Sequence, residues 1–320
     1  MAEAHPPLTS STRNSQSGQD TPAIETDQLI VRYGRRTAVD GLTLRVPRGS
    51  VFGLLGANGA GKTSTIKTLL GFRRPSGGAA HILGLDITRD RVRINGRIGY
   101  VSETNTLYMG MTIPELCAFY KATALRWDQG AVDRSLALFG LSPRARVRNL
   151  SKGMRTQLAL SLALGGVPDL LILDEPTTGL DPIARRAFLD VLMSDAAAAG
   201  TTIFFSSHVL SDVEAVADCV AILRRGRLMA SGEIDALKRQ HGVIRLSYND
   251  APSDELLAAL GGVYGVDQVE REGRFVRVRA HSDLATVESA LRAIAEPVTV
   301  ETSSLSLDDI FLYYAREVAA

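Results

Sequence analysis

The chain has 320 residues, of which 45% are hydrophobic, so it is long enough to bury one large core and a smaller one. Its formal net charge of +1 supplies no basic field of the kind that drives sequence-independent binding to nucleic acid. Two cysteines, Cys117 and Cys219, are too few and too far apart to suggest a disulfide framework or a metal site. No stretch approaches the roughly 20 apolar residues that span a bilayer, so any work at a membrane requires a separate spanning chain.

The first part of the chain predicts a leader followed by an α/β domain. Residues 1–23 are polar and rich in Ser, Pro and Gln, which is typical of a disordered segment. From residue 24 to residue 240, strand-like runs alternate with helix-like runs, which predicts a central α/β sheet. The expected elements are strands at residues 29–33, 42–46, 51–55, 170–174 and 201–207, and helices at residues 62–70, 114–125, 131–138 and 182–198. Residues 224–232 have the pattern of a hairpin and lead into a short helix that ends near residue 240.

Residues 241–320 have the pattern of a second, smaller domain of the βαβ type. Strands are expected at residues 243–248, 274–280 and 298–302, and helices at residues 254–260, 284–294 and 307–317. No catalytic constellation follows Gly242. We therefore predict a dimerisation or regulatory module, and the residues leave the choice between these roles open.

The motif GANGAGKT, Gly56 to Thr63, lies between an expected strand and an expected helix. It fits the pattern G-x-x-x-x-G-K-[ST], in which a glycine-rich loop directs several backbone N–H groups toward phosphate oxygens. Lys62 is placed to reach the β and γ phosphates, and the hydroxyl of Thr63 is placed to reach Mg²⁺. The first inference is therefore a nucleoside triphosphate with Mg²⁺.

Two further strands end in groups that suit phosphate chemistry. The apolar run LLILDEP ends in Asp174 and Glu175, so Asp174 is placed for the coordination sphere of Mg²⁺ and Glu175 for polarising a water. His208 follows the strand-like run FFSS, and strands of an open parallel sheet end at the ligand crevice. The other histidines have the pattern of structural residues: His5, His81, His241 and His281.

A second anion site is indicated at LSKGM, residues 150–154. A serine, a glycine and free backbone N–H groups stand there at the start of an expected helix. The simpler alternative is an ordinary helix that Ser151 caps. The residues alone do not say which anion such a site faces.

Taken together, these motifs resemble the nucleotide-binding domain of ATP-binding cassette (ABC) transporters over residues 24–240. The resemblance implies a P-loop NTPase cassette: a RecA-like core with an antiparallel β subdomain and an α-helical subdomain, followed by the small α+β appendage at residues 241–320. It identifies Gly56 to Thr63 as the Walker A loop, Asp174 as the Walker B aspartate and Glu175 as the catalytic glutamate. His208 matches the switch histidine, TGLD matches the D-loop, and LSKGM matches the family signature, which is usually LSGGQ.

The resemblance also implies a set of site residues. Glu175 and His208 are the expected catalytic residues, and Thr63, Glu103 and Asp174 are the expected Mg²⁺ ligands. The expected nucleotide contacts are Tyr33, which would stack on adenine, and Gly56, Ala57, Asn58, Gly59, Ala60, Gly61, Lys62, Thr63, Ser64, Ser151, Gly153 and Asp181. In this family the signature of one subunit closes over the ATP held by its partner, so Ser151 and Gly153 would face a nucleotide of the other protomer.

The sequence departs from the family pattern in two motifs. Glu103 stands where a glutamine is usual; it keeps an oxygen ligand but adds a charge that would alter metal affinity and coupling. Lys152 and Met154 replace the usual glycine and glutamine of the signature, which keeps the serine and adds a cation near phosphate.

The resemblance implies an ATPase motor subunit, most similar to those of two-component drug and envelope exporters. Such a subunit dimerises around two ATP molecules, most simply as a homodimer, and drives a separate transmembrane permease. It would lie in the cytoplasm on the inner face of the membrane, with residues 104–112 toward the permease. One alternative is a soluble cassette ATPase acting on ribosomes or DNA, and another is a nucleotide-gated regulator. The single Walker A loop, the lack of a long heptad run and the balanced charge argue against the first alternative.

Overall fold

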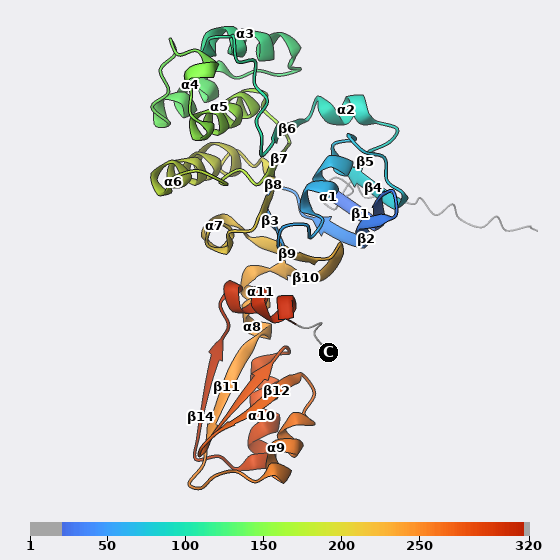
Figure 1. The fold of residues 1–320 in the computed structure, drawn as a ribbon, viewed down its shortest axis with the longest axis vertical. Coiled ribbons are helices and arrows are strands. Elements are labelled where there is room, and N and C mark those ends of the chain that lie inside the picture. Colours follow the sequence, from blue (N-terminus) through green and yellow to red (C-terminus); the bar gives the residue numbers. More distant parts are fainter. Residues whose placement is uncertain (1–20, 317–320) are drawn as a thin grey trace, which may run out of the picture.

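The computed structural model describes residues 21–316 and contains three sheets (Figure 1). Residues 1–20 of the expected leader lie outside the described residues. Ala23, near the end of that expected leader, is fully buried and donates its backbone N–H to the carbonyl of Val46. This bond holds the chain in place just before its first strand.

The central sheet has six strands in the order β10-β9-β3-β8-β7-β6. Five strands run parallel and β10 pairs antiparallel with β9. Every residue of β3, β7 and β8 is buried, as expected for parallel strands that are covered on both faces. The bounds are β3 Val51–Leu55, β6 Ile98–Val101, β7 Leu170–Asp174, β8 Thr202–Ser207, β9 Cys219–Arg224 and β10 Arg227–Glu233. The hairpin expected at residues 224–232 is the β9–β10 pair.

Four helices accompany this sheet: α1 (Lys62–Leu69), α6 (Pro182–Val191), α7 (Leu210–Val216) and α8 (Ile234–Gln240). The single helix expected at residues 182–198 is in fact two segments. After α6 the chain continues as a π-helical stretch, η2 (Leu192–Ala197), in which Ala198 donates its N–H to the carbonyl of Met193, five residues back.

A second sheet is antiparallel and has the order β2-β1-β4-β5. It comprises β1 (Ile24–Tyr33), β2 (Arg36–Val46), β4 (Gly77–Ile82) and β5 (Leu85–Asp86), and the short helix α2 (Arg91–Asn95) follows it. Sequence patterning did not predict β4, β5, β6 or α2. The run GGAAHI of β4 has weak β propensity, and its strand conformation comes from pairing with β1.

A group of helices lies beyond the β6 and β7 edge of the central sheet (Figure 1). It contains α3 (Ile113–Thr123), α4 (Gln129–Leu138), the 3₁₀ turn η1 (Val147–Asn149) and α5 (Lys152–Gly165). Thr112 and Glu115 form a capping box at the start of α3. Ser151 caps α5 by accepting the N–H of Met154 at 3.1 Å, so the signature segment stands at a helix N-terminus, as expected.

The C-terminal part is a four-stranded sheet in the order β12-β13-β11-β14, in which all neighbours are antiparallel. Its elements are β11 (Gly242–Ser247), α9 (Asp254–Gly261), β12 (Val266–Glu272), β13 (Phe275–Ala280), α10 (Leu284–Ala295) and β14 (Thr299–Ser304). This is the split βαβ topology of ferredoxin-like folds. Strand β12 was not predicted, because its sequence VDQVERE is too polar to show a strand pattern.

The last helix, α11 (Leu307–Arg316), returns from the C-terminal sheet to lie beside α8 (Figure 1). There Arg224, at the end of β9, donates a side-chain hydrogen bond of 2.8 Å to the carbonyl of Tyr314. The fully buried side chains of Leu307 and Ile310 join the hydrophobic core beneath the central sheet. Among residues 21–316, no helix has the length and apolar character needed to cross a membrane.

Candidate functional site

The glycine-rich loop joins β3 to α1, and its glycines are required by its close packing. Gly61 has a φ of 113°, and a Cβ there would lie 2.6 Å from the carbonyl oxygen of Ala38. A Cβ at Gly56 would lie 2.7 Å from the carbonyl oxygen of Leu223. The loop therefore adopts a conformation that larger residues cannot share.

Lys62 is held inside this loop rather than exposed to solvent. Its Nζ donates to the carbonyl of Gly56 at 2.5 Å and to that of Ala57 at 3.4 Å, and it forms an ion pair with Oε1 of Glu175 at 3.0 Å. The two charged side chains are only 5% and 10% exposed. The lysine therefore satisfies its charge with protein oxygens in the place where phosphate oxygens would bind.

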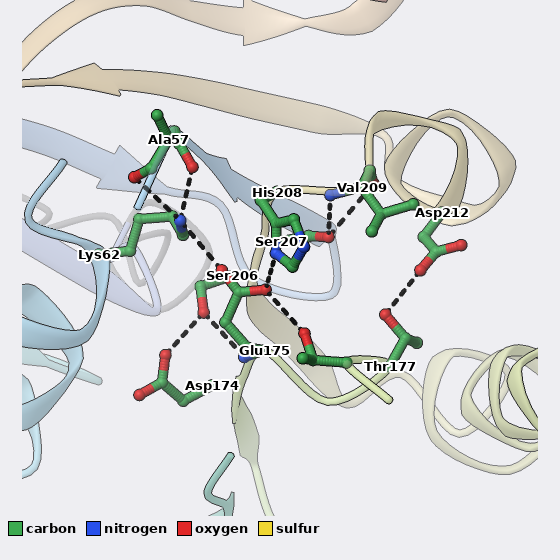
Figure 2. Close-up of polar contacts among 12 residues, drawn as sticks. Ala57, Lys62, Asp174, Glu175, Thr177, Ser206, Ser207, His208, Val209 and Asp212 are labelled. Atoms are coloured by element: carbon green, nitrogen blue, oxygen red, sulfur yellow. Dashed lines mark hydrogen bonds and ion pairs between the residues drawn. The ribbon is translucent and has the colours of Figure 1, made fainter. Parts of the chain in front are cut away.

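Strand β7 delivers two carboxylates to the same point, as the run LLILDEP predicts. Asp174 is buried and accepts a hydrogen bond from Ser206 at 2.8 Å (Figure 2). It also accepts a hydrogen bond from Thr63 at 3.2 Å. Glu175 leaves the strand with a φ of 49°, in the left-handed region that side chains rarely adopt. Its backbone N–H donates to the Oγ of Ser206 at 3.0 Å.

His208, at the end of β8, completes the network (Figure 2). Its Nδ1 lies 2.6 Å from Oε2 of Glu175, and Thr178 donates to the same oxygen at 3.2 Å. One carboxylate thus joins the loop lysine on one side to the histidine on the other. The structure brings Lys62, Thr63, Asp174, Glu175 and His208 together, as the sequence predicts.

The two adjacent carboxyl groups have pKa values shifted in opposite directions. Burial raises the pKa of Asp174 above its ordinary value, and the nearby charges of Glu175 and Glu103 act in the same direction. The hydrogen bonds from Ser206 and Thr63 lower this pKa but do not outweigh burial. Burial also acts to raise the pKa of Glu175, but the hydrogen bonds and charges of Lys62 and His208 outweigh it and lower that pKa. Glu175 is therefore held as a carboxylate.

Glu175 and His208 line one cleft of about 310 Å³, together with the loop from Asn58 to Ser64 and the exposed side chain of Glu103. Asp174 does not line the cleft itself; it is buried and contacts the cleft through its hydrogen bond with Thr63. Within the described residues, no group of three or more His, Cys, Asp or Glu side chains makes a metal site by itself. The hydroxyl of Thr63 and the carboxylates of Asp174 and Glu103 are hard oxygen donors of the type that Mg²⁺ prefers. They fit a cation that takes its remaining ligands from phosphate and water.

Four residues of the site were not predicted from the sequence. Arg36, Ala38 and Thr178 line the cleft, and Ser206 bonds both Asp174 and the backbone of Glu175. The position of Ser206 in FFSSH, two residues before the histidine, carries the only signal that sequence patterning offers for it.

Comparison with known proteins agrees with this geometry. Residues 39–178 match the protein-family model described as ABC transporter. Over 314 residues the chain is 37% identical to the daunorubicin/doxorubicin resistance ATP-binding protein DrrA of Streptomyces peucetius, with 92% of each chain covered. The chain belongs to the ABC transporter family. This ABC cassette is also 37% identical, over 220 residues, to the bacitracin transport ATP-binding protein BcrA of Bacillus licheniformis, covering 68% of this chain and 72% of that one.

A solved structure of an ATP binding subunit of an ABC transporter is similar to the cassette with a TM-score of 0.62 and 32% identity. The match covers 68% of this chain and 92% of that one. The predicted fold class, a P-loop NTPase cassette, is confirmed. Membership of the family implies ATPase activity for this chain.

The remaining expected nucleotide contacts lie outside the cassette's own cleft. Ser151 and Asp181 are exposed at the N-termini of α5 and α6, where each accepts a capping N–H, and neither lines the cleft. Gly153 packs near the D-loop, because a Cβ there would lie 3.1 Å from the Leu180 side chain. The capping role expected as the simpler alternative for Ser151 is therefore present within one chain.

Tyr33 also stands apart from the cleft. It is 41% exposed at the end of β1 and pairs with Arg36, which does line the cleft. The guanidinium carbon of Arg73 lies 3.8 Å from the centre of the Tyr33 ring and so covers one of its faces. Only the other face is available for stacking on a base.

Proposed function

We propose that this chain is the ATP-hydrolysing motor subunit of an ABC exporter. Two copies would bind two Mg-ATP molecules between them and drive a separate transmembrane permease. The observation that carries the proposal is the network in which Glu175 joins the loop lysine to the histidine at the end of β8. The matches to the DrrA and BcrA proteins, whose names describe drug resistance and bacitracin transport, support the export role.

Different residues at the cleft would bind the nucleotide, hold Mg²⁺ and activate the attacking water. Backbone N–H groups of the loop and Lys62 would bind the β and γ phosphates of ATP, with Tyr33 and its exposed ring face against the base. Thr63, Asp174 and Glu103 would hold Mg²⁺, which stabilises the charge that develops on the phosphates. Glu175 would accept a proton from the attacking water. His208 would hydrogen-bond to that carboxylate and to the terminal phosphate, and so fix their relative positions.

The second subunit supplies what one chain lacks. Ser151, Gly153 and Asp181 would face the nucleotide held by the partner, since none of them lines the cleft of its own chain. A serine hydroxyl and helix N–H groups aimed at the γ-phosphate add charge stabilisation in the transition state. Lys152, exposed beside them, would add a cation.

A second cleft, of about 400 Å³, fits a helix of the permease. It lies between the central sheet and the helical group, and its lining includes Phe72, Tyr100, Leu107, Leu125 and Trp127. Phe72 and Leu125 are 61% and 77% exposed, which is unusual for large apolar side chains. Part of the segment expected to face the permease, residues 104–112, borders this cleft. Binding there would place the cassette on the inner face of the membrane.

A complementation experiment tests the shared site. Lys62→Ala removes the loop cation and Ser151→Arg blocks the signature, so each variant alone should lose ATPase activity while Ser151→Arg still binds ATP. If the sites are shared between subunits, a 1:1 mixture contains heterodimers in which one site is intact, and activity should return to about a quarter of wild type. An inactive mixture, with exchange of subunits shown by light scattering or cross-linking, would refute the shared site.

Coupling to export needs a separate test. The ATPase rate should rise in membranes that contain the permease and stay unchanged in membranes without it. Leu125→Ser should abolish that stimulation while leaving the basal rate intact, since Leu125 lies in the second cleft and not in the nucleotide cleft. Stimulation that survives Leu125→Ser would place the permease elsewhere.

A further inference from the structure

We infer that Ser206 is a positioning residue that sets both the Mg²⁺ carboxylate and the catalytic glutamate through a single hydroxyl. This inference rests on the proposed function, because it assigns Asp174 to the metal and Glu175 to the water. The hydroxyl donates to Oδ1 of Asp174 at 2.8 Å and accepts the backbone N–H of Glu175 at 3.0 Å (Figure 2). Ser206 is fully buried, so water does not replace either bond.

The position of Ser206 follows from the register of the central sheet. Strands β7 and β8 run parallel, and Asp174 and Ser206 are direct partners at their ends. On the other side of β8, Ser206 is the partner of Leu54 in β3. The backbone of Ser206 is therefore held by neighbours on both sides, and its side chain can be changed without moving the strand.

The bond to Glu175 supports an unfavourable backbone. The chain leaves β7 at Glu175 with a φ of 49°, and the N–H of this buried residue donates to a side chain, the Oγ of Ser206. A buried N–H without an acceptor is costly, and the hydroxyl of Ser206 is the acceptor that the structure supplies. Holding this backbone turn directs the Glu175 side chain toward Lys62 and His208.

The bond to Asp174 orients the metal carboxylate. Oδ1 receives two hydroxyl donors, Ser206 at 2.8 Å and Thr63 at 3.2 Å. The Thr63 hydroxyl is itself an expected Mg²⁺ ligand, so on metal binding it would turn away from the carboxylate. Ser206 would then remain the protein donor that holds the Asp174 carboxylate in place for Mg²⁺.

Removing one hydroxyl should therefore affect metal binding and turnover together. Ser206→Ala should raise the Mn²⁺ concentration that half-saturates the protein with a non-hydrolysable ATP analogue, measured by electron paramagnetic resonance of free Mn²⁺, by about fivefold or more. It should also lower kcat by about tenfold or more. Ser206→Thr, which keeps the hydroxyl, should restore both quantities to within about threefold of wild type.

Ser161→Ala is the matched control. Ser161 is also a fully buried serine, but its hydroxyl only bonds the carbonyl of Gln157 within α5 at 3.1 Å. It should leave Mn²⁺ binding and kcat unchanged. The melting temperature of each variant, measured in parallel, separates loss of fold from loss of positioning.

The inference is overturned if Ser206→Ala retains wild-type Mn²⁺ binding and kcat, or if Ser206→Thr is impaired as severely as Ser206→Ala. In the second case the side-chain volume, not the hydroxyl, matters at this position. Failure of the proposed function has a different signature: the wild-type protein itself would neither hydrolyse ATP nor bind the Mn²⁺–nucleotide complex.

Discussion

Replacing Glu175 with glutamine removes one charge from an ion pair that the nucleotide-free protein buries. The pair joins Nζ of Lys62 to Oε1 of Glu175 at 3.0 Å, with side chains only 5% and 10% exposed. Removing one partner of a buried pair costs about 3–5 kcal/mol, because the other charge is left unbalanced. Lys62 keeps its bonds to the carbonyls of Gly56 and Ala57, so we expect the lower end of this range, about 3 kcal/mol.

The same substitution should strengthen nucleotide binding. In the wild-type protein, the phosphates must take Lys62 away from Glu175, whereas in Glu175→Gln they meet a lysine without a carboxylate partner. The nucleotide-free variant should melt about 4–6 °C below wild type. Its affinity for a non-hydrolysable ATP analogue should rise by about tenfold or more, so the stabilisation by the analogue should be larger than in wild type.

Scanning calorimetry with and without the analogue, together with isothermal titration, measures both effects. Asp190→Asn is the matched control, since it removes a carboxylate from an ion pair with Arg186 whose side chains are 60% and 76% exposed. An exposed pair of this kind contributes about 0–1 kcal/mol, so the control should melt close to wild type. Equal melting temperatures and equal affinities for Glu175→Gln and wild type would refute the reasoning.

The difference in stability between wild type and Glu175→Gln should also change with pH in a defined direction. The pKa of Glu175 is lowered below its ordinary value of 4.5 in the folded protein, because Lys62 and His208 outweigh the effect of burial. The stabilisation from its carboxylate is therefore fully present above pH 4.5 and is lost as the pH falls through the lowered pKa. The difference in stability between wild type and Glu175→Gln should be constant near neutral pH and shrink below pH 4.5; a difference that grows on acidification contradicts this assignment.

Three further substitutions test the local structure. Gly61→Ala would place a Cβ 2.6 Å from the carbonyl oxygen of Ala38, at a residue whose φ is 113°. The affinity for ATP, measured by calorimetry, should therefore fall about tenfold or more. Gly110→Ala is the control: a Cβ there meets nothing within 4 Å, so this variant should bind ATP as wild type does. Phe188→Ala, at a fully buried position, should cost about 3–5 kcal/mol in urea unfolding, and a loss under about 1 kcal/mol would contradict its place in the core. Thr112→Ala removes the capping box of α3 and should cost about 1 kcal/mol; no loss would mean that water caps the helix equally well.

Much of the site could be predicted because each of its parts is local in sequence. The loop from Gly56 to Thr63 has glycines and a lysine at a fixed spacing, which can be recognised in the sequence. The apolar run before Asp174 and Glu175 likewise predicts a buried strand that ends in two carboxylates. Strand patterns placed β3, β7 and β8 close to their observed bounds, and α5 begins at the signature segment, as expected, because buried parallel strands and a capped helix have strong local signals. The family resemblance then predicted a role for each of these motifs in their order along the chain.

Other features were not visible because they depend on partners distant in the chain. Strand β4 has glycines and alanines and takes its conformation from β1, and β12 is too polar to show its pairing with β13. Tyr33 is an expected base contact, yet Arg73, from a segment 40 residues further along, covers one face of its ring. Ser206 looks like an ordinary serine until the register of β7 and β8 sets it against Asp174.

The sequence by itself determined which groups are present and where the phosphate loop lies, because backbone sterics and strand patterning act over a few residues. Only the tertiary structure decided that Lys62, Glu175 and His208 share one network and that the Ser206 hydroxyl bonds both Asp174 and the backbone of Glu175. Lys62 begins α1, Glu175 follows β7 and His208 follows β8, so the distances among them arise from the register and packing of the central sheet. Charge and hydrogen-bond energies depend on such distances and on exclusion of water, which the order of residues alone does not specify.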